Sequence, residues 1–169
     1  MMNFLNKLCG ERTALPPRAS GTTIGLGLLG GILAMGLLAG LLEASGIPWV
    51  LGSFGASCVL VFGYPDSPFS QPRNIVLGHA LSSFIGLLFL AWCGAHWWSV
   101  ALATGIAIGA MMWTRTVHPP AGSNPVIIYL TQPAWSFLLT PTLAGALVLT
   151  LLALLYHNIS RKAAWPKYW

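Results

Sequence analysis

The strongest constraint on the fold is a polar, proline-broken stretch that lies between two apolar segments. Residues 114–125 read Thr-Arg-Thr-Val-His-Pro-Pro-Ala-Gly-Ser-Asn-Pro. Irregular backbone at membrane depth leaves N–H and C=O groups unpaired, so it occurs only where protein or a water-filled cavity surrounds it. The apolar run that follows, at 125–130, is too short to span a bilayer. We therefore expect a half-helix whose N-terminus opens onto the broken stretch, with the backbone donors of Gly122, Ser123 and Asn124 free.

The composition indicates that the chain lies in a membrane. Only 7% of the 169 residues are charged and 56% are hydrophobic, whereas soluble domains are about 25% charged. The formal net charge of +5 comes from basic residues at the ends of apolar segments, which indicates membrane topology rather than nucleic-acid binding. The three cysteines do not form the pattern of a disulfide framework. We expect an all-α, polytopic membrane protein with a single transmembrane domain over residues 21–156.

The order of apolar segments predicts a bundle of four full spans and two interrupted ones. The first span follows a basic lead and is too long for a signal-peptide core, so we expect it to be retained. A three-proline loop at 64–74 and a second loop at 132–136 separate later segments. Full spans are expected at 21–42, 75–93, 99–113 and 137–156, and interrupted ones at 47–63 and 114–130.

A weak internal repeat accompanies this order. Residues 56–62 align with 122–128, and residues 77–81 align loosely with 144–147. Interrupted segments at matching places in two halves are a signature of transporters, although chance similarity is the alternative. Each half would be a span, a broken half-helix segment and a span, with repeat 1 at about 21–93 and repeat 2 at about 97–156.

Two topologies are open, depending on whether the broken segments cross the membrane or re-enter. About seven extended residues and ten helical ones reach roughly 38 Å, enough for a hydrocarbon core of about 30 Å. If both segments cross, there are six passages in two inverted repeats, Arg73 and Arg115 lie with the basic ends in the cytoplasm, and Glu43 lies outside. If both re-enter, four spans remain and both arginines lie outside. The positive-inside rule favours six passages.

The same rule predicts the location of both ends of the chain. Residues 1–20 are expected to form a cytoplasmic segment with a short surface helix around residues 4–8. Residues 157–169 combine cations with aromatic residues, the composition of an interfacial anchor, and are expected to form a cytoplasmic tail. The membrane would be a bacterial-type inner membrane.

Several motifs in the chain occur together. His118-Pro119-Pro120 is accompanied by Phe54-Gly55-Ala56-Ser57 and by Gln71-Pro72-Arg73-Asn74 ahead of Gly78-His79. In this combination the chain resembles the HPP family of small integral membrane proteins over roughly residues 20–156. The resemblance implies a family usually described with four membrane spans. It also implies nitrite transport, described for relatives in photosynthetic organisms, while many bacterial members have no assigned substrate. Ser123-Asn124-Pro125 departs from the small residues expected after the motif, which leaves the substrate open.

Two half-helices that meet N-terminus to N-terminus would form an anion site without a buried cation. Glycines would let the backbone approach the ion, and the serines would act as hydroxyl donors, as N-caps or as both. His118 would donate to the anion and carry a proton, or else bond a backbone carbonyl and hold the Pro-Pro turn. The predicted binding residues are Gly55, Ala56, Ser57, Cys58, His118, Gly122, Ser123 and Asn124.

A second group of residues is predicted to act as an entrance or gate. Arg73 and Arg115 would attract anions to the cytoplasmic mouth, or serve topology and lipid headgroups alone. His79 shares one side of its helix with Ser82 and Ser83 and is expected to act in the site or as a gate. Asp66, between two prolines, is expected to pair with Arg73 or to turn the backbone.

The predicted function is the passage of a small inorganic anion, with nitrite first by resemblance, through a carrier or a channel. The alternatives are a non-transporting anchor or sensor and a transporter of another small solute. The sequence shows no pairing of a nucleophile with a base that would indicate an enzyme. The histidines are scattered, so they indicate neither a metal site nor a cofactor. His96 and His157 are expected at the membrane interface. The expected partners are the anion, a proton, the lipid bilayer and a second copy of the chain, and no nucleic acid.

Overall fold

The structure is a computed structural model that describes residue 8 and residues 13–169. The surface helix expected around residues 4–8 lies outside the described residues except at Leu8. Every regular element in the described part of the chain is helical. The elements are α2 (Gly21–Ser45), α3 (Gly52–Cys58) with η1 (Val59–Gly63), η2 (Pro68–Ser70), α4 (Pro72–Cys93), α5 (Trp97–Trp113), η3 (Pro119–Ser123), α6 (Asn124–Thr131), η4 (Trp135–Leu138), η5 (Leu139–Leu143) and α7 (Ala144–Ser160).

Three segments in the described chain are long and apolar enough to cross a membrane, namely Gly21–Ser45, Pro72–Cys93 and Trp135–Ser160. Two shorter apolar helices, Gly52–Gly63 and Trp97–Trp113, accompany them. The chain is therefore a helical membrane-spanning protein, as its composition predicts. The last span was expected to be one helix from 137 to 156, but Thr140 is extended, with φ −132° and ψ 125°. Pro141 has no N–H to continue a helix, and α7 begins only at Ala144.

Local sequence signals account for the ends of the long helices. Ser20 caps α2, since its hydroxyl accepts from the N–H of Thr23 at 3.2 Å. Gly46 ends α2 in the left-handed region, at φ 69°, which glycine adopts without strain. Pro72 stands at the first position of α4, where a missing N–H costs nothing.

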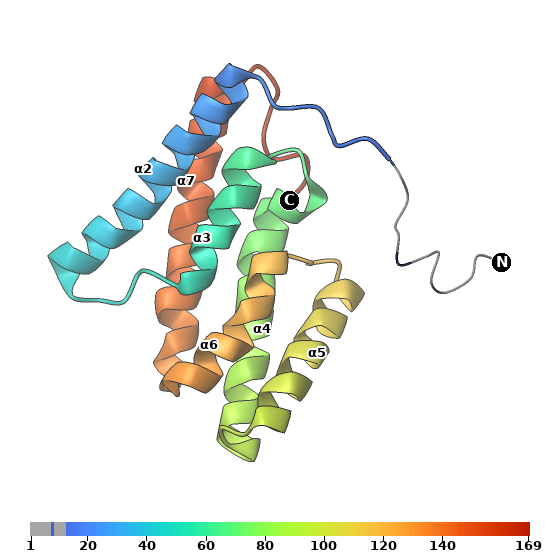
Figure 1. The fold of residues 1–169 in the computed structure, drawn as a ribbon. Helices are drawn as coiled ribbons and strands as arrows, with labels where there is room; N and C mark the ends of the chain where they lie inside the picture. Colours follow the sequence, from blue (N-terminus) through green and yellow to red (C-terminus); the bar gives the residue numbers. More distant parts are fainter. Residues whose placement is uncertain (1–7, 9–12) are drawn as a thin grey trace.

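The two short helices start near the middle of the bundle and run away from each other, α3 toward the end where α2 begins and α6 toward the opposite end (Figure 1). Helix α2 and helix α7 lie side by side, and α4 lies between α7 and α5 in contact with α6. The first residue of α2 and the last of α7 lie at the same end of the bundle (Figure 1).

Glycines on the long helices allow the broken segments to approach closely, and Gly78 and Gly145 are two examples. A Cβ atom on Gly78 of α4 would lie 2.9 Å from both the Cβ of His118 and the carbonyl oxygen of Thr116. A Cβ atom on Gly145 of α7 would overlap the ring of Phe54 and lie 2.8 Å from the carbonyl oxygen of Trp49. Because real Cβ atoms do not approach so closely, each glycine allows a broken segment to pack directly on a helix backbone.

Candidate functional site

A single hydroxyl group joins two buried histidines in the middle of the protein. The Oγ of Ser57, on α3, lies 3.0 Å from the Nε2 of His79 on α4 and 2.8 Å from the Nε2 of His118, which immediately precedes η3. All three residues have 0% exposed surface. The two imidazole rings lie edge to face, with centroids 5.0 Å apart. The structure therefore brings together one residue from each broken segment and one from a full span.

The outer partners of the two rings determine where the protons lie. The Nδ1 of His118 is 2.7 Å from the carbonyl oxygen of Phe69, which can only accept, so Nδ1 carries the proton and Nε2 is a bare acceptor in the neutral ring. The Nδ1 of His79 is 3.1 Å from the amide Nδ2 of Asn124, a donor, so the proton of His79 is on Nε2. His79 thus donates to Ser57. The single hydroxyl proton of Ser57 goes to the bare Nε2 of His118 at 2.8 Å rather than to the more distant carbonyl of Ser53 at 3.2 Å, which gives one directed chain.

Asn124 extends this chain toward the last span. Its Oδ1 accepts from the hydroxyl of Ser53 at 2.8 Å, and its Nδ2 donates to the Oγ of Ser83 at 2.8 Å. Ser83 in turn lies 3.0 Å from the hydroxyl of Thr142. These buried polar groups satisfy one another, and a satisfied buried network holds its members rigidly in place. We call Ser53, Ser57, His79, Ser83, His118, Asn124 and Thr142 the histidine–serine cluster.

Of the eight predicted binding residues, three meet in the cluster, namely Ser57, His118 and Asn124. The other five do not point into it. Gly55, Ala56 and Ser123 are exposed, Gly122 is partly exposed, and Cys58 packs in the apolar core. The helical period explains the difference on α3, since Ser53 and Ser57 are four residues apart on one face while Gly55 and Ala56 lie on another.

The expectation of free backbone donors on the second broken segment is wrong for Asn124. The N–H of Asn124 donates to the carbonyl of Ala121, at the end of the 3-10 helix η3. The N–H of Ala121 donates to the carbonyl of His118 at 2.9 Å, and Pro119 and Pro120 have no N–H to offer. The hydroxyl of Ser123 donates to the carbonyl of Pro120 at 2.8 Å. At Asn124 the backbone N–H is therefore not free for a ligand, and this residue contributes to the cluster through its side chain.

The two predicted gate arginines lie together at the surface. Arg73 and Arg115 line a cavity of about 420 Å³ with Tyr168 and Trp169. A guanidinium nitrogen of Arg73 donates to the carbonyl of Thr114 at 3.2 Å. The third predicted gate residue, His79, lies inside the cluster and not at this entrance.

The comparison with known families identifies the chain. A family model described as the HPP transmembrane region matches residues 16–166. The chain belongs to the HPP family. The HPP resemblance drawn from the motifs is therefore confirmed, and the histidine of the motif, His118, is one of the two histidines that contact Ser57.

Two transmembrane proteins of Dictyostelium discoideum are similar to this HPP chain. One is 38% identical, over 82% of this chain and 51% of the relative. The other is 36% identical, over 95% of this chain and 55% of the relative. The chain thus spans about half the length of these curated relatives. No solved structure matches it.

Two residues of the histidine–serine cluster, Ser53 and Thr142, were not predicted. Ser53 has a signal, because it lies one helical turn before Ser57. Ser82 and Ser83, predicted on the same side as His79, are fully buried as it is, and Ser83 contacts the same amide nitrogen of Asn124 as His79 does. Thr142 has no sequence signal, because it follows the irregular backbone at Thr140.

Two polar residues outside the cluster have partners that the sequence did not predict. His157, near the end of α7, is 2% exposed, and its Nε2–H donates to the carbonyl of Val61 at 3.0 Å. The expected pairing of Asp66 with Arg73 is wrong, because Asp66 pairs with Arg161, and with Lys167 at 3.1 Å, and it lies in a turn, which was the other role expected of it. Slight burial raises the pKa of Asp66, but the hydrogen bonds and charges of Lys167 and Arg161 lower that pKa by more, so it lies below its usual value.

Proposed function

We propose that this HPP protein transports a small inorganic anion together with a proton across the membrane, and that the anion is nitrite. The supporting observation is the hydroxyl of Ser57 held between two buried imidazoles. Ionisable side chains inside a membrane protein are costly and mark ion or proton pathways. Imidazole is also the side chain that most readily exchanges a proton at about pH 5 to 8. The choice of nitrite rests on the family resemblance.

The directed hydrogen bonds offer a route for one proton. When a proton binds the Nδ1 of His79, the ring becomes cationic and its Nε2 proton can move to the oxygen of Ser57. The hydroxyl proton of Ser57 then moves to the Nε2 of His118. The Nδ1–H of His118, now in a cationic ring, can leave on the side of Phe69. One proton enters and one leaves, and the two hydrogen bonds of Ser57 with the imidazoles reverse their direction. The bond from Asn124 to the Nδ1 of His79 must break for the proton to enter there.

The same cluster can couple the proton to an anion. A protonated imidazole supplies the positive charge that the second broken segment lacks, because its backbone donors at Ala121 and Asn124 are already bonded. An anion beside that imidazole favours its protonated form, so each ligand raises the affinity for the other. Because His79, Ser57 and His118 are fully covered, the surrounding helices must move before an anion can reach them.

We propose that the helices form two inverted repeats with six passages. Helices α3 and α6 leave the middle of the bundle in opposite directions (Figure 1). Gly78 and Gly145 occupy corresponding places in the aligned stretches 77–81 and 144–147, and each receives the broken segment of the other half. This reciprocal packing is expected when two three-helix units are related by a twofold axis in the membrane plane.

This topology places both the start of α2 and the end of α7 in the cytoplasm by the positive-inside rule. A cysteine at Ser67 should then react with an impermeant thiol reagent only from the cytoplasmic side, and one at Glu43 only from the opposite side. The unsubstituted chain gives the background from its own cysteines. Labelling of both positions from one side would contradict the six-passage arrangement.

Nitrite uptake into proteoliposomes tests the proposed function. Uptake should exceed that of empty vesicles, increase with an inward proton gradient and be lost in His118→Ala. His96→Ala is the matched control, because His96 is an exposed histidine at the start of α5 that stacks on Trp98 far from the cluster contacts. Competition by nitrate and chloride would define the range of anions. Uptake equal to that of empty vesicles would refute nitrite transport, and equal loss in both histidine variants would refute the role of the cluster.

A further inference from the structure

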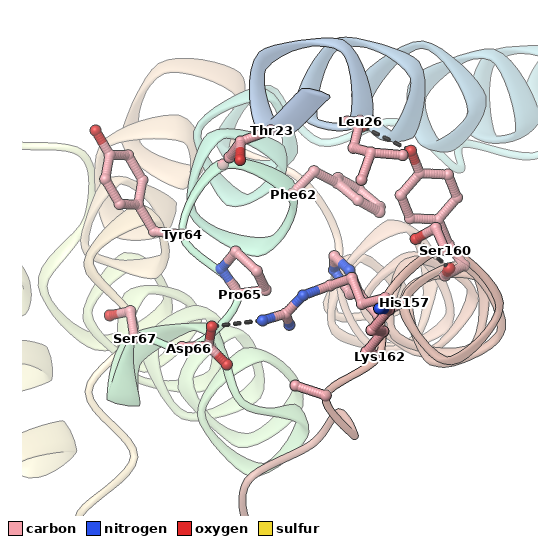
Figure 2. Close-up of a pocket in the computed structure, with 14 residues that line it drawn as sticks. Thr23, Leu26, Phe62, Tyr64, Pro65, Asp66, Ser67, His157, Ser160 and Lys162 are labelled. Carbon is pink, nitrogen blue, oxygen red and sulfur yellow. Dashed lines mark hydrogen bonds and ion pairs between the residues drawn. The ribbon is translucent and has the colours of Figure 1, made fainter. Parts of the chain in front are cut away.

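A cavity separate from the histidine–serine cluster opens where α2 begins and α7 ends. It has a volume of about 680 Å³, and no member of the cluster lines it. Figure 2 shows Thr23 and Leu26 of α2 on one side of this cavity, Asp66 of the loop before η2 on another, and His157 near the end of α7 on a third. We call it the basic-end cavity.

Two buried nitrogen atoms at this cavity have no hydrogen-bond partner among the described residues. Arg161 binds the carboxylate of Asp66 through one guanidinium nitrogen, and its other terminal nitrogen, Nη1, is unpaired. His157 is 2% exposed and donates from Nε2 to Val61, so its Nδ1 is a bare acceptor in the neutral ring, and it too is unpaired. Because a buried unpaired polar group costs stability, the pair indicates a ligand that supplies both an acceptor and a donor.

The charge at the cavity favours an anion as that ligand. Arg161 and Lys162 both line it, and Asp66 is the one acidic residue among the described residues of the lining. The carboxylate of Asp66 is fully engaged, since one oxygen binds Arg161 and the other lies 3.1 Å from Lys167. A positive excess therefore faces the cavity, at a membrane end that also carries Arg18 before α2.

An apolar groove continues from the basic-end cavity along α2. This groove, of about 510 Å³, shares Thr23, Gly63 and Tyr64 with the cavity and runs past Gly31 to Ile32. From Thr23 to Ile32 the helix advances roughly 14 Å at about 1.5 Å per residue. A Cβ atom on Gly31 would meet nothing within 4 Å, so the groove is open here. A cavity with an excess of cationic side chains, joined to an apolar groove of this length, matches the two parts of a phospholipid.

We propose that the basic-end cavity and its groove bind one anionic phospholipid whose headgroup carries free hydroxyl groups, as phosphatidylglycerol does. Because both nitrogen atoms are covered in the structure, the side chains of Arg161 and His157 turn toward the cavity on binding. The phosphate then accepts from the Nη1 of Arg161 beside Lys162, and a headgroup hydroxyl donates to the Nδ1 of His157. One acyl chain lies along α2 between Thr23 and Ile32. Basic cavities between membrane helices on the cytoplasmic side recognise anionic headgroups in this way.

Native mass spectrometry of the full chain in detergent, titrated with defined lipids, tests this site. Phosphatidylglycerol should bind with one tight site, phosphatidic acid more weakly because it lacks the hydroxyls, and phosphatidylcholine no more than background. Lys162→Gln should weaken phosphatidylglycerol binding about fivefold, the contribution expected of one basic side chain near an anionic headgroup. Arg18→Gln, which removes an exposed cation at the same end but outside the cavity, should leave the affinity unchanged.

A second pair of variants tests the groove without touching the charges. Gly31→Leu should fill the groove and reduce lipid binding, whereas Gly36→Leu, on the same helix with open space around it and outside the groove, should not. Equal binding of phosphatidylcholine, or equal losses in Lys162→Gln and Arg18→Gln, would overturn the proposal. The proposal would also be overturned if inorganic phosphate displaced the lipid and Gly31→Leu still bound lipid fully, because the cavity would then be a site for a free anion.

Discussion

Ser57→Ala removes the hydroxyl that joins His79 and His118, and it gives the clearest test of the cluster. The variant leaves the Nε2–H of His79 without an acceptor and the Nε2 of His118 without a donor, on side chains that have 0% exposed surface. Each buried group left unpaired costs about 1–3 kcal/mol. We therefore expect the free energy of unfolding to fall by about 2–6 kcal/mol.

The two rings cannot readily replace the lost bonds with each other. Their centroids are 5.0 Å apart in an edge-to-face arrangement, so a direct Nε2–H to Nε2 bond requires one ring to turn. Turning His118 would break its bond to Phe69, and turning His79 would break its bond to Asn124. The expected loss therefore stays large even if one ring moves.

Unfolding of the purified protein by denaturant in mild detergent, followed by tryptophan fluorescence, measures this loss. Ser53→Ala is the matched control within the cluster, because it removes a single donor, to the Oδ1 of Asn124, and should cost about 1–3 kcal/mol. Ser123→Ala is the control outside it, on an exposed residue of the second broken segment. If Ser57→Ala is no less stable than Ser123→Ala, the hydroxyl does not link the two histidines and the proton route fails.

Two further predictions concern packing and charge. Gly78→Ala should lower the free energy of unfolding by about 1–3 kcal/mol through overpacking against Thr116 and His118, less the roughly 1 kcal/mol that alanine gains in a helix. Gly105→Ala is the control and should show no loss, because its new Cβ atom would meet nothing within 4 Å. A Gly78→Ala variant as stable as the unsubstituted chain would contradict the close approach. Asp66→Asn should cost less than about 1 kcal/mol near pH 7, because the ion pairs are half exposed. Since the pKa of Asp66 is lowered from 3.8, its pairs with Arg161 and Lys167 stabilise the protein above about that pH and are lost as the pH falls through the lowered pKa. The stability difference between the unsubstituted chain and Asp66→Asn should therefore vanish at the acid end of a pH series, and a difference that grows there would refute the assignment.

The sequence alone predicted the class of protein and the order of its segments. Low charge and long apolar runs require a membrane. Irregular backbone was predicted at 64–74 and 114–125, and the structure narrows it chiefly to 64–67 and 114–118, because Pro68, Pro72 and Pro119 each begin a helical element. The motifs around His118 also identified the family, which the family model over residues 16–166 confirms. These features depend on local chemistry, so they can be read without knowing what each segment touches.

Only the tertiary structure decided which of the polar residues meet. Ser57 and Ser123 align in the repeat, yet Ser57 is buried between two histidines and Ser123 is exposed. The difference accompanies the 3-10 turn η3, at whose end the N–H of Asn124 bonds the carbonyl of Ala121 while the side chain of Asn124 reaches His79. The approach of His118 to α4 depends on the missing side chain of Gly78, a contact between residues far apart in the chain. Spacing along one helix predicts which residues share a face, but the packing between helices determines what that face contacts.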